Sequence, residues 1–363
     1  MEVSPSSSES IPVTKPFLPP LNEYQSYVEH IWNRNWLTND GPLVNELEKK
    51  LKEKLKVEQL LFVTNGTIAI QLAIRALNLT GKIITTPFSY VATTSSIIWE
   101  NCEPLFVDID PGTCNLAPEK IEAAITKDTS AILATHVYGI PCAVEQIESI
   151  AKKHRLKVIY DGAHAFGVKY KGESIFNWGD ISTCSFHATK LFHTVEGGAV
   201  FTKDPEYLKR MKYHRNFGHD GFDKFAMLGI NGKNSEFHAA MGLVNLNYAE
   251  SILEKRKFLC ETYDEQLNSL NISRPVIPAD CTYNFAYYPV IFDSENTLLK
   301  VMKAMNGQDI FPRRYFYPTL DSLSFLKSGN NCPVASSIAS RILCLPLFDS
   351  LELSEIEQVC AVI

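Results

Sequence analysis

Apolar positions between residues 60 and 202 follow two patterns in turn. Short β-branched and aliphatic runs, typical of buried strands, occupy residues 60–64, 82–86, 105–108, 131–135, 156–160, 181–186 and 198–202. Segments between these runs carry helical spacing, as in residues 70–77, where apolar residues repeat at i, i+3, i+4 and i+7. Strands that alternate with helices predict an α/β fold, a mostly parallel sheet with helices on both faces.

The segments outside this alternation have a different character. Residues 1–13 are rich in serine and have no period, which is typical of a flexible segment. Beyond residue 250 an amphipathic helix leads into Pro275 and Pro278 and then into a smaller α+β pattern. We therefore expect a flexible N-terminal segment at 1–13, a large domain at 14–250 and a small C-terminal domain at 251–363.

A stretch rich in glycine and asparagine, residues 216–234, separates two helical patterns. Its length predicts a functional loop. The helix expected after it, from about Ser235 to Ser251, is apolar around much of its circumference. Such a helix is buried, either in the core of the chain or in a contact between two copies of it.

Composition narrows the class of protein. A chain of 363 residues with 45% hydrophobic content is typical of a globular protein with ample length for a core. A net charge of -6 argues against a general nucleic-acid surface, which needs a basic face, but leaves room for a local cationic pocket. The nine cysteines form no C-x-x-C pair and share no metal-ligand spacing with histidines, so we expect free thiols and no metal site.

Targeting signals are not apparent in the sequence. No stretch approaches ~20 uninterrupted apolar residues, and the serine-rich start lacks the apolar centre of a signal peptide. We therefore expect neither a membrane span nor secretion. Because free cysteines are typical of reducing compartments, the expected location is the cytoplasm.

Two strand ends carry the candidate catalytic residues. Lys190 follows the apolar run 181–186, and Asp161 follows the run 156–160. Sites in α/β folds form where strands end. A lysine amine can hold the aldehyde of pyridoxal 5′-phosphate (PLP), and a carboxylate can keep the pyridine nitrogen of that cofactor protonated. The alternative, that Lys190 is an ordinary solvated lysine, is weakened by the acid at a second strand end.

The turn Asn65-Gly66-Thr67 lies between a predicted strand and a predicted helix. Free N–H groups and the positive end of the helix dipole bind phosphate at such a point, and glycine allows close approach of the backbone. By itself this tripeptide is an ordinary turn. Together with Asp161 and Lys190 it becomes a candidate phosphate site.

The chain resembles the DegT/DnrJ/EryC1/StrS family of sugar-nucleotide aminotransferases, which are fold type I PLP enzymes. The resemblance covers nearly the whole chain and implies a large PLP-binding domain with a smaller C-terminal α+β domain. Seven ordered segments carry it: residues 36–42 (WLTNDGP), 65–67 (NGT), 86–93 (TPFSYVAT), 107–110 (VDID), 161–164 (DGAH), 185–198 (SFHATKLFHTVEGG) and 229–233 (GINGK).

The resemblance implies roles for individual residues. Lys190 would anchor the cofactor and then move the substrate proton as general base and acid, while Asp161 would face the pyridine nitrogen. The family also contains dehydratases that carry histidine in place of the lysine, so Lys190 favours transamination. The further implied contacts are phosphate binding by Gly66, Thr67 and Ser185, ring stacking by Tyr90, the O3′ side of the ring for His164, and the cofactor phosphate of a neighbouring subunit for Asn231. The last contact implies an obligate homodimer with shared active sites.

Residues 311–318 (FPRRYFYP) and 343–347 (LCLPL) resemble the subgroup that acts on dTDP-4-keto-6-deoxyglucose or its 3-keto isomer. The resemblance favours amination at C4 with L-glutamate as donor, and amination at C3 stays open. Since a dTDP-sugar carries a diphosphate, we expect Arg313 and Arg314 to bind it, with Tyr315 covering the sugar or base. The alternative for either arginine is a pair with a local acid.

Two alternatives come from other functional classes. A non-catalytic regulator that binds PLP or a sugar nucleotide would carry an added DNA-binding segment, and the sequence has no basic helix-turn-helix pattern. An interaction protein on an inactive scaffold would tolerate loss of Lys190 or Asp161, and both are present.

One residue departs from the family pattern. Val195 stands where the family usually has glycine. A β-branched residue does not easily adopt a positive φ, so we expect a conventional backbone conformation at this position. The departure leaves Lys190 itself unchanged.

Overall fold

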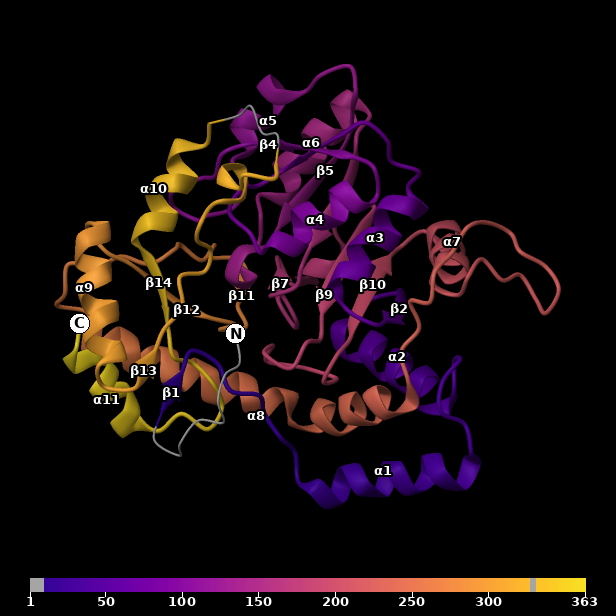
Figure 1. The fold of residues 1–363 in the computed structure, drawn as a ribbon, viewed down its shortest axis with the longest axis horizontal. Helices are drawn as coiled ribbons and strands as arrows, with labels where there is room; N and C mark the ends of the chain where they lie inside the picture. The colour runs from indigo at the N-terminus through magenta and orange to yellow at the C-terminus, as the bar shows by residue number, and fades with distance from the viewer. Residues whose placement is uncertain (1–9, 327–330) are drawn as a thin grey trace.

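The structure, a computed structural model, describes residues 10–326 and 331–363. Its centre is a seven-stranded sheet within these residues, in which neighbouring strands run parallel except β10, which is antiparallel to both its neighbours (Figure 1). The mostly parallel sheet predicted from the alternating pattern is therefore confirmed. In spatial order the strands are β2 (Gln59–Val63), β10 (Gly198–Thr202), β9 (Ile181–Ser185), β6 (Lys157–Asp161), β5 (Thr129–Thr135), β3 (Lys82–Thr85) and β4 (Glu103–Phe106).

Helices cover both faces of this sheet. Successive side chains of a strand point to opposite faces, so apolar strands make both faces apolar and both are buried under helices. In β2, Leu61 and Val63 join one apolar cluster, and Leu60 and Phe62 join another. The first cluster packs beneath α3 (Gly66–Ala76), α4 (Val91–Trp99) and α7 (Pro205–Arg215). The second packs beneath α2 (Pro42–Leu55), α5 (Pro118–Ala124), α6 (Val144–His154) and the N-terminal half of α8 (Glu236–Leu267).

The C-terminal part of the chain packs around a two-stranded antiparallel ribbon and has its own apolar cluster. The helix α8 contributes to this cluster through Leu259 and Tyr263 and runs along the length of the molecule (Figure 1). The expected boundary between residues 250 and 251 thus lies inside a continuous helix, and we propose that this helix joins the two domains. The elements of this part are β12 (Tyr288–Ile291), α9 (Glu295–Asn306), β13 (Ile310–Phe311), α10 (Pro333–Arg341), β14 (Ile342–Leu345) and α11 (Leu353–Ala361).

The end of the expected flexible segment is ordered. Residues 1–9 lie outside the described residues, but β1 (Ile11–Pro12) pairs in parallel with β13. Ile11 and Val13 are buried, and the Val13 carbonyl accepts a hydrogen bond from the amide of Leu347 at 3.0 Å. The prediction of flexibility is wrong for residues 11–13, because their apolar side chains pack against the C-terminal part of the chain.

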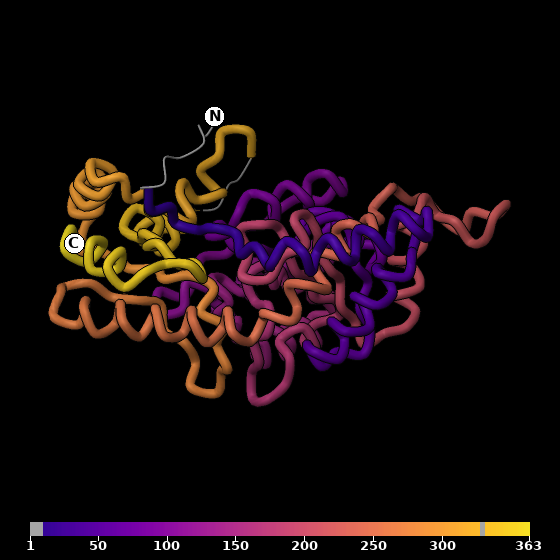
Figure 2. Tube along the Cα trace, turned by 90° about the horizontal axis from the view of Figure 1, so that it is seen from below, coloured from indigo at the N-terminus to yellow at the C-terminus, as the bar shows by residue number. Residues whose placement is uncertain are grey.

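The remaining elements connect these layers. Residues 216–235 form a long loop between α7 and α8 that projects from the body of the molecule (Figures 1 and 2). Within residues 10–326 and 331–363, no helix has the length and apolar character required to cross a bilayer. The other elements are α1 (Leu21–Arg34), β7 (Lys169–Tyr170), β8 (Glu173–Ser174), β11 (Cys281–Thr282) and 3-10 turns at Val137–Gly139, Ile175–Asn177 and Leu320–Ser322.

Candidate active site

A cavity of about 450 Å³ lies at the carboxyl edge of the large sheet. It opens where β2, β3, β5, β6 and β9 end, which is the edge at which α/β sheets form their sites. The structure brings together there most of the residues that the sequence predicted. The predicted residues that line this cavity are Gly66, Thr67, Tyr90, Asp161, His164, Ser185, Lys190 and Tyr315.

Lys190 lies in the loop that follows β9, as its sequence position predicted. Its backbone amide donates to the carbonyl of His187 at 2.9 Å, which shapes a tight turn and directs the side chain into the cavity. The Nζ atom donates to the phenol oxygen of Tyr287 at 3.2 Å. A half-buried amine with a single neutral partner keeps the capacity to react with an aldehyde.

Asp161 ends β6 and is 5% exposed. One carboxylate oxygen accepts from the hydroxyl of Thr93 at 2.7 Å, and the other accepts from the amide of Ala163 at 3.0 Å. Burial raises the pKa of this carboxyl, and the Thr93 hydroxyl, the Ala163 amide and the charge of Lys190 oppose the rise. No ion pair joins Asp161 to Lys190 among the described residues. The carboxylate is therefore available to a protonated ring nitrogen, as PLP requires.

His164 lines the cavity beside Asp161 and is buried. Its Nδ1 accepts from the amide of Tyr138 at 3.2 Å, so the proton of the neutral ring is on Nε2. Burial, together with the charge of Lys190, lowers the pKa of His164. The ring lies parallel to Phe316 with centroids 5.8 Å apart, which holds its plane. A neutral imidazole with a donating Nε2–H suits a phenolic oxygen such as O3′.

The start of α3 fits a phosphate group. The side chain of Asn65 caps the helix by accepting from the amide of Ile68 at 2.9 Å. The amides of Gly66 and Thr67 are the first of the helix and have no acceptor within it. A Cβ at Gly66 would lie 3.0 Å from the Cβ of Ser185, so a side chain there would fill the cradle. The backbone and the Ser185 hydroxyl together present donors to an anion at a positive helix end.

The loop after Lys190 corrects one expectation. Val195 adopts a positive φ of 67°, although its β-branched side chain predicted a conventional conformation. The amide of Val195 donates to Nδ1 of His193 at 3.2 Å, and the hydroxyl of Thr194 donates to the carbonyl of Glu196 at 2.8 Å. The side-chain amide of Asn234 donates to the same carbonyl at 2.9 Å. These contacts, two within the loop and one from Asn234 just before α8, hold a conformation that glycine would adopt without strain.

A wider cavity of about 1210 Å³ adjoins the first and shares Tyr90, Tyr315 and Phe316 with it. Both predicted arginines line this second cavity, but they differ in their contacts. Arg314 pairs with Glu295 at 2.7 Å, donates to the carbonyl of Ser340 at 3.0 Å and lies 3.4 Å over the ring of Tyr317.

Arg313 is exposed, and within residues 10–326 and 331–363 its guanidinium has no hydrogen bond or ion pair. The local-acid alternative therefore applies to Arg314, which is held in place by Glu295. Arg313 is the arginine of the pair that is available to a ligand.

Asn231 does not line either cavity of its own chain. It is exposed on the projecting loop and pairs through its backbone with Asn216. Large apolar side chains are exposed on the same loop, among them Phe222, which is fully exposed, Phe225 and Leu228. A projecting loop with exposed apolar side chains is typical of a contact with another protein surface.

Two residues of the site were not anticipated. Thr93 lies three positions after Tyr90, one turn into α4, and its position within the quoted 86–93 segment is the signal that could have identified it. Tyr287 comes from the chain just before β12 and contacts Lys190 across 97 residues of sequence. No local motif announces such a contact.

The chain matches the DegT/DnrJ/EryC1/StrS aminotransferase family over residues 21–363. It is 42% identical over 357 residues to dTDP-4-amino-4,6-dideoxy-D-glucose transaminase of Shigella dysenteriae, with 97% of each chain covered. It is 39% identical over 358 residues to the protein of the same name from Escherichia coli, with 95% of each covered. Among solved structures, DesI in the presence of its TDP-sugar product is similar with a TM-score of 0.92 at 30% identity, covering 98% of this chain and 92% of that one.

Proposed function

The chain belongs to the DegT/DnrJ/EryC1/StrS aminotransferase family, and from this premise we propose that it converts dTDP-4-keto-6-deoxy-D-glucose to dTDP-4-amino-4,6-dideoxy-D-glucose with L-glutamate as amino donor. The names of the two transaminases at 42% and 39% identity support the sugar and the C4 position. The observation that carries the proposal is the single cavity in which Lys190, Asp161 and the start of α3 meet. Amination at C3 of a 3-keto isomer is the alternative.

The enzyme is a PLP-dependent aminotransferase. When bound, PLP supplies an electron sink for the carbon that loses its proton. We propose that the amine of Lys190 holds the cofactor and later carries the proton between the substrate carbon and C4′ of the cofactor. Asp161, shielded from water, keeps the ring nitrogen protonated.

We propose that the remaining cavity residues position the cofactor. Gly66, Thr67 and Ser185 bind its phosphate through N–H and O–H donors, each contributing about 1.5 to 3 kcal/mol as hydrogen bonds to a charged group. Tyr90 is 61% exposed at the mouth of the cavity, where its ring is free to stack on the pyridine. His164 donates to O3′ through its Nε2–H.

We propose that the sugar nucleotide binds in the wider cavity. Its volume of about 1210 Å³ suits a ligand larger than the cofactor, and it adjoins the first cavity at Tyr315. We propose that Arg313 binds the diphosphate, because its guanidinium has no partner among the described residues. Arg314 holds the segment 311–318 in place through its ion pair with Glu295.

We also propose a homodimer in which Asn231 reaches the cofactor phosphate of the partner subunit. The support is the position of Asn231 outside its own cavity and the exposed apolar side chains of the projecting loop. The apolar start of α8 gives no separate support, because Ala239, Ala240 and Leu243 are buried in the core of the single chain.

The decisive experiment offers the purified enzyme two substrates, dTDP-4-keto-6-deoxy-D-glucose and its 3-keto isomer, with L-glutamate in each case. We expect a 4-amino product from the first, identified by NMR of the isolated sugar nucleotide, and at most slow turnover of the second. Turnover of the 3-keto isomer alone would replace C4 with C3 in the proposal. L-Alanine and L-aspartate in place of L-glutamate test the donor, and sedimentation at assay concentration tests the dimer.

A further inference from the structure

The segment from Tyr283 to Tyr287 is held against the cofactor cavity from two sides. The side-chain amide of Asn284 donates to the carbonyls of His164 at 2.8 Å and Phe166 at 2.9 Å. The guanidinium of Arg256, which is buried on α8, donates to the carbonyls of residues 285 and 286 at 2.9 and 2.7 Å. Four hydrogen bonds to charged or amide donors thus fix a stretch of irregular backbone next to the site.

The residue that this segment presents to the cavity is Tyr287. It is 7% exposed, and its ring packs edge-on against His164 and Tyr315, with centroids 4.9 and 5.7 Å away. Its phenol oxygen accepts from Lys190 Nζ at 3.2 Å and has no other hydrogen-bond partner among the described residues. The aromatic neighbours leave the ring little room to rotate, so the oxygen stays at one place on the cavity wall.

We propose that Tyr287 is a positioning residue for the free amine of Lys190. Its oxygen accepts one N–H of the amine, and the lone pair of the nitrogen is thereby directed into the cavity, where the substrate carbon loses its proton. The inference rests on the proposed role of Lys190 as proton carrier.

The chemistry of the surroundings explains why a phenol suits this place. A carboxylate would pair with the lysine as an ammonium ion and hold its proton, whereas a neutral oxygen accepts an N–H from either form of the amine. His164 cannot take this role, because its Nδ1 is already bound to the amide of Tyr138. A lysine side chain has several rotatable bonds, so holding the nitrogen in place lowers the entropy cost of reaching a reactive geometry.

The first test uses the protein without cofactor. Reductive methylation with formaldehyde and cyanoborohydride at fixed pH, followed by mass spectrometry, gives the labelling rate of Lys190 relative to the exposed Lys257. In Tyr287→Phe we expect this ratio to rise by about twofold to tenfold, which corresponds to losing one hydrogen bond. Tyr288→Phe is the matched control, because the neighbouring hydroxyl contacts Asp264 at 2.7 Å and not Lys190. An unchanged ratio in Tyr287→Phe, or equal changes in both variants, would overturn the proposal.

The second test uses the loaded enzyme and L-glutamate deuterated at the α-carbon. Tyr287→Phe should slow the glutamate half-reaction and enlarge its isotope effect while the concentration for half-saturation stays the same. A changed half-saturation with an unchanged rate would make Tyr287 a binding residue and refute the positioning role. Tyr287→His, whose ring nitrogen can accept from the amine, should restore part of the rate and also serves if the Phe variant does not fold. If the unmodified enzyme showed no turnover with glutamate, the proposed donor would be wrong. The labelling test, which needs neither donor nor cofactor, would still test the positioning role of Tyr287.

Discussion

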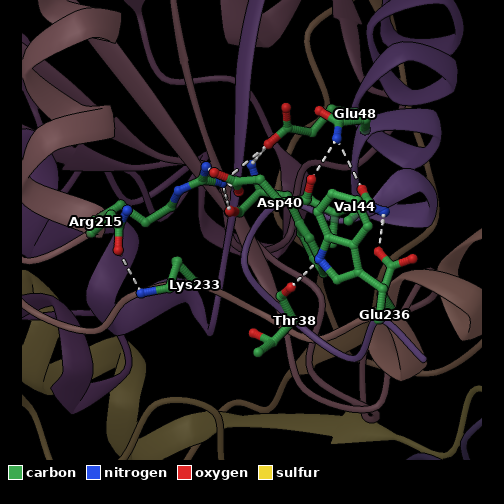
Figure 3. Close-up of polar contacts among 12 residues, drawn as sticks. Thr38, Asp40, Val44, Glu48, Arg215, Lys233 and Glu236 are labelled. Carbon is green, nitrogen blue, oxygen red and sulfur yellow. Dashed lines mark hydrogen bonds and ion pairs between the residues drawn. The ribbon is translucent and has the colours of Figure 1, made fainter. Parts of the chain in front are cut away.

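Two regions of this protein contain charged side chains that are buried or half-buried. In the first region these side chains have only neutral partners, and in the second they form ion pairs. In the cavity, Lys190 has one neutral partner and Asp161 has two, and no ion pair joins them among the described residues. Near the start of α2, Arg215 contacts Asp40 at 2.6 Å, Glu48 at 3.3 Å and the carbonyl of residue 62 at 2.8 Å (Figure 3).

The second region also contains a buried acid whose carboxylate oxygens both accept hydrogen bonds from this chain. Glu236 is fully buried and accepts from the amides of Leu43 and Val44, both at 2.9 Å, so it caps α2 from a distant part of the chain (Figure 3). Buried charges that are paired within the chain stabilise the scaffold, whereas buried charges without a charged partner mark a place where a ligand can bind. The contrast predicts that mutations in the two regions change different observables.

The largest effect is expected for Lys190→Ala. The variant should lose the visible absorbance of covalently bound PLP, and transamination should fall by about a thousandfold or more, since it lacks the amine that we propose as covalent anchor and general base. Its free energy of unfolding should change little. Absorption spectra and steady-state rates measure this, with the exposed Lys257→Ala as control. A reducible covalent link to the protein in Lys190→Ala would show that another residue is the anchor.

Glu236→Ala tests the opposite region. We expect the free energy of unfolding to fall by about 3 kcal/mol, because two buried amides of α2 lose an ionised acceptor. Urea denaturation measures this, and PLP absorbance should persist in the folded variant. Glu46→Ala, which removes a half-buried surface acid of the same helix that pairs with Lys50, should change stability by less than about 0.5 kcal/mol. Equal losses in the two variants would remove the distinction between the regions.

The adjacent residues Arg313 and Arg314 show the same contrast, because Arg314 is paired within the chain and the guanidinium of Arg313 has no partner among the described residues. Arg313→Ala should raise the KM for the sugar nucleotide by about tenfold, the cost of one charge-assisted hydrogen bond, and leave the glutamate half-reaction nearly unchanged. Arg314→Ala should lower stability through loss of its contacts with Glu295 and Tyr317 and raise this KM less. Stopped-flow spectra of each half-reaction decide between them. Equal losses in both half-reactions, or in neither, would exclude Arg313 from the substrate site.

His136 represents a third case, a buried group that stays uncharged. Burial lowers its pKa to about 3, and its Nδ1 accepts from the amide of Cys142 at 3.0 Å. Below about pH 6.5 the unfolded chain binds a proton that the folded chain lacks, so the free energy of unfolding should fall by about 1.4 kcal/mol per pH unit from this group.

His136→Asn keeps an acceptor for the Cys142 amide and removes the titrating ring. Denaturation at pH 7, 6 and 5 should therefore show a shallower loss of stability in the variant than in the parent protein. Parallel pH dependences in the two proteins would show that another group causes the acid sensitivity.

The smallest effect is expected at Val195. Glycine adopts a φ of 67° without the cost of about 1 kcal/mol or more that an L side chain incurs there, although it adds entropy to the unfolded chain. Val195→Gly should therefore raise the free energy of unfolding by up to about 1 kcal/mol. Ala188→Gly in the same loop, where φ is not positive, should lower it by roughly 0.5 to 1 kcal/mol. Thermal denaturation in which both variants shift in the same direction would contradict the strain argument.

The sequence alone determined the fold class and the placement of Asp161 and Lys190 at one edge of the sheet. Strand runs, helical spacing and turn residues are local properties, so the carboxyl edge with Asp161 and Lys190 followed from chain order once the sheet was mostly parallel. The glycine turn at Gly66 was readable for the same reason, because the start of a helix presents free amides wherever it occurs.

Tertiary packing decided the features that depend on distant neighbours. It brought Tyr287 to Lys190, gave Arg314 an acid and left Arg313 free, ordered residues 11–13 on β13 and held Val195 at a positive φ. Each of these outcomes depends on contacts between segments far apart in the chain, whose energies are comparable to the local preferences they override. Local pattern therefore placed Asp161 and Lys190 at the edge of the sheet, and packing determined which side chains surround them.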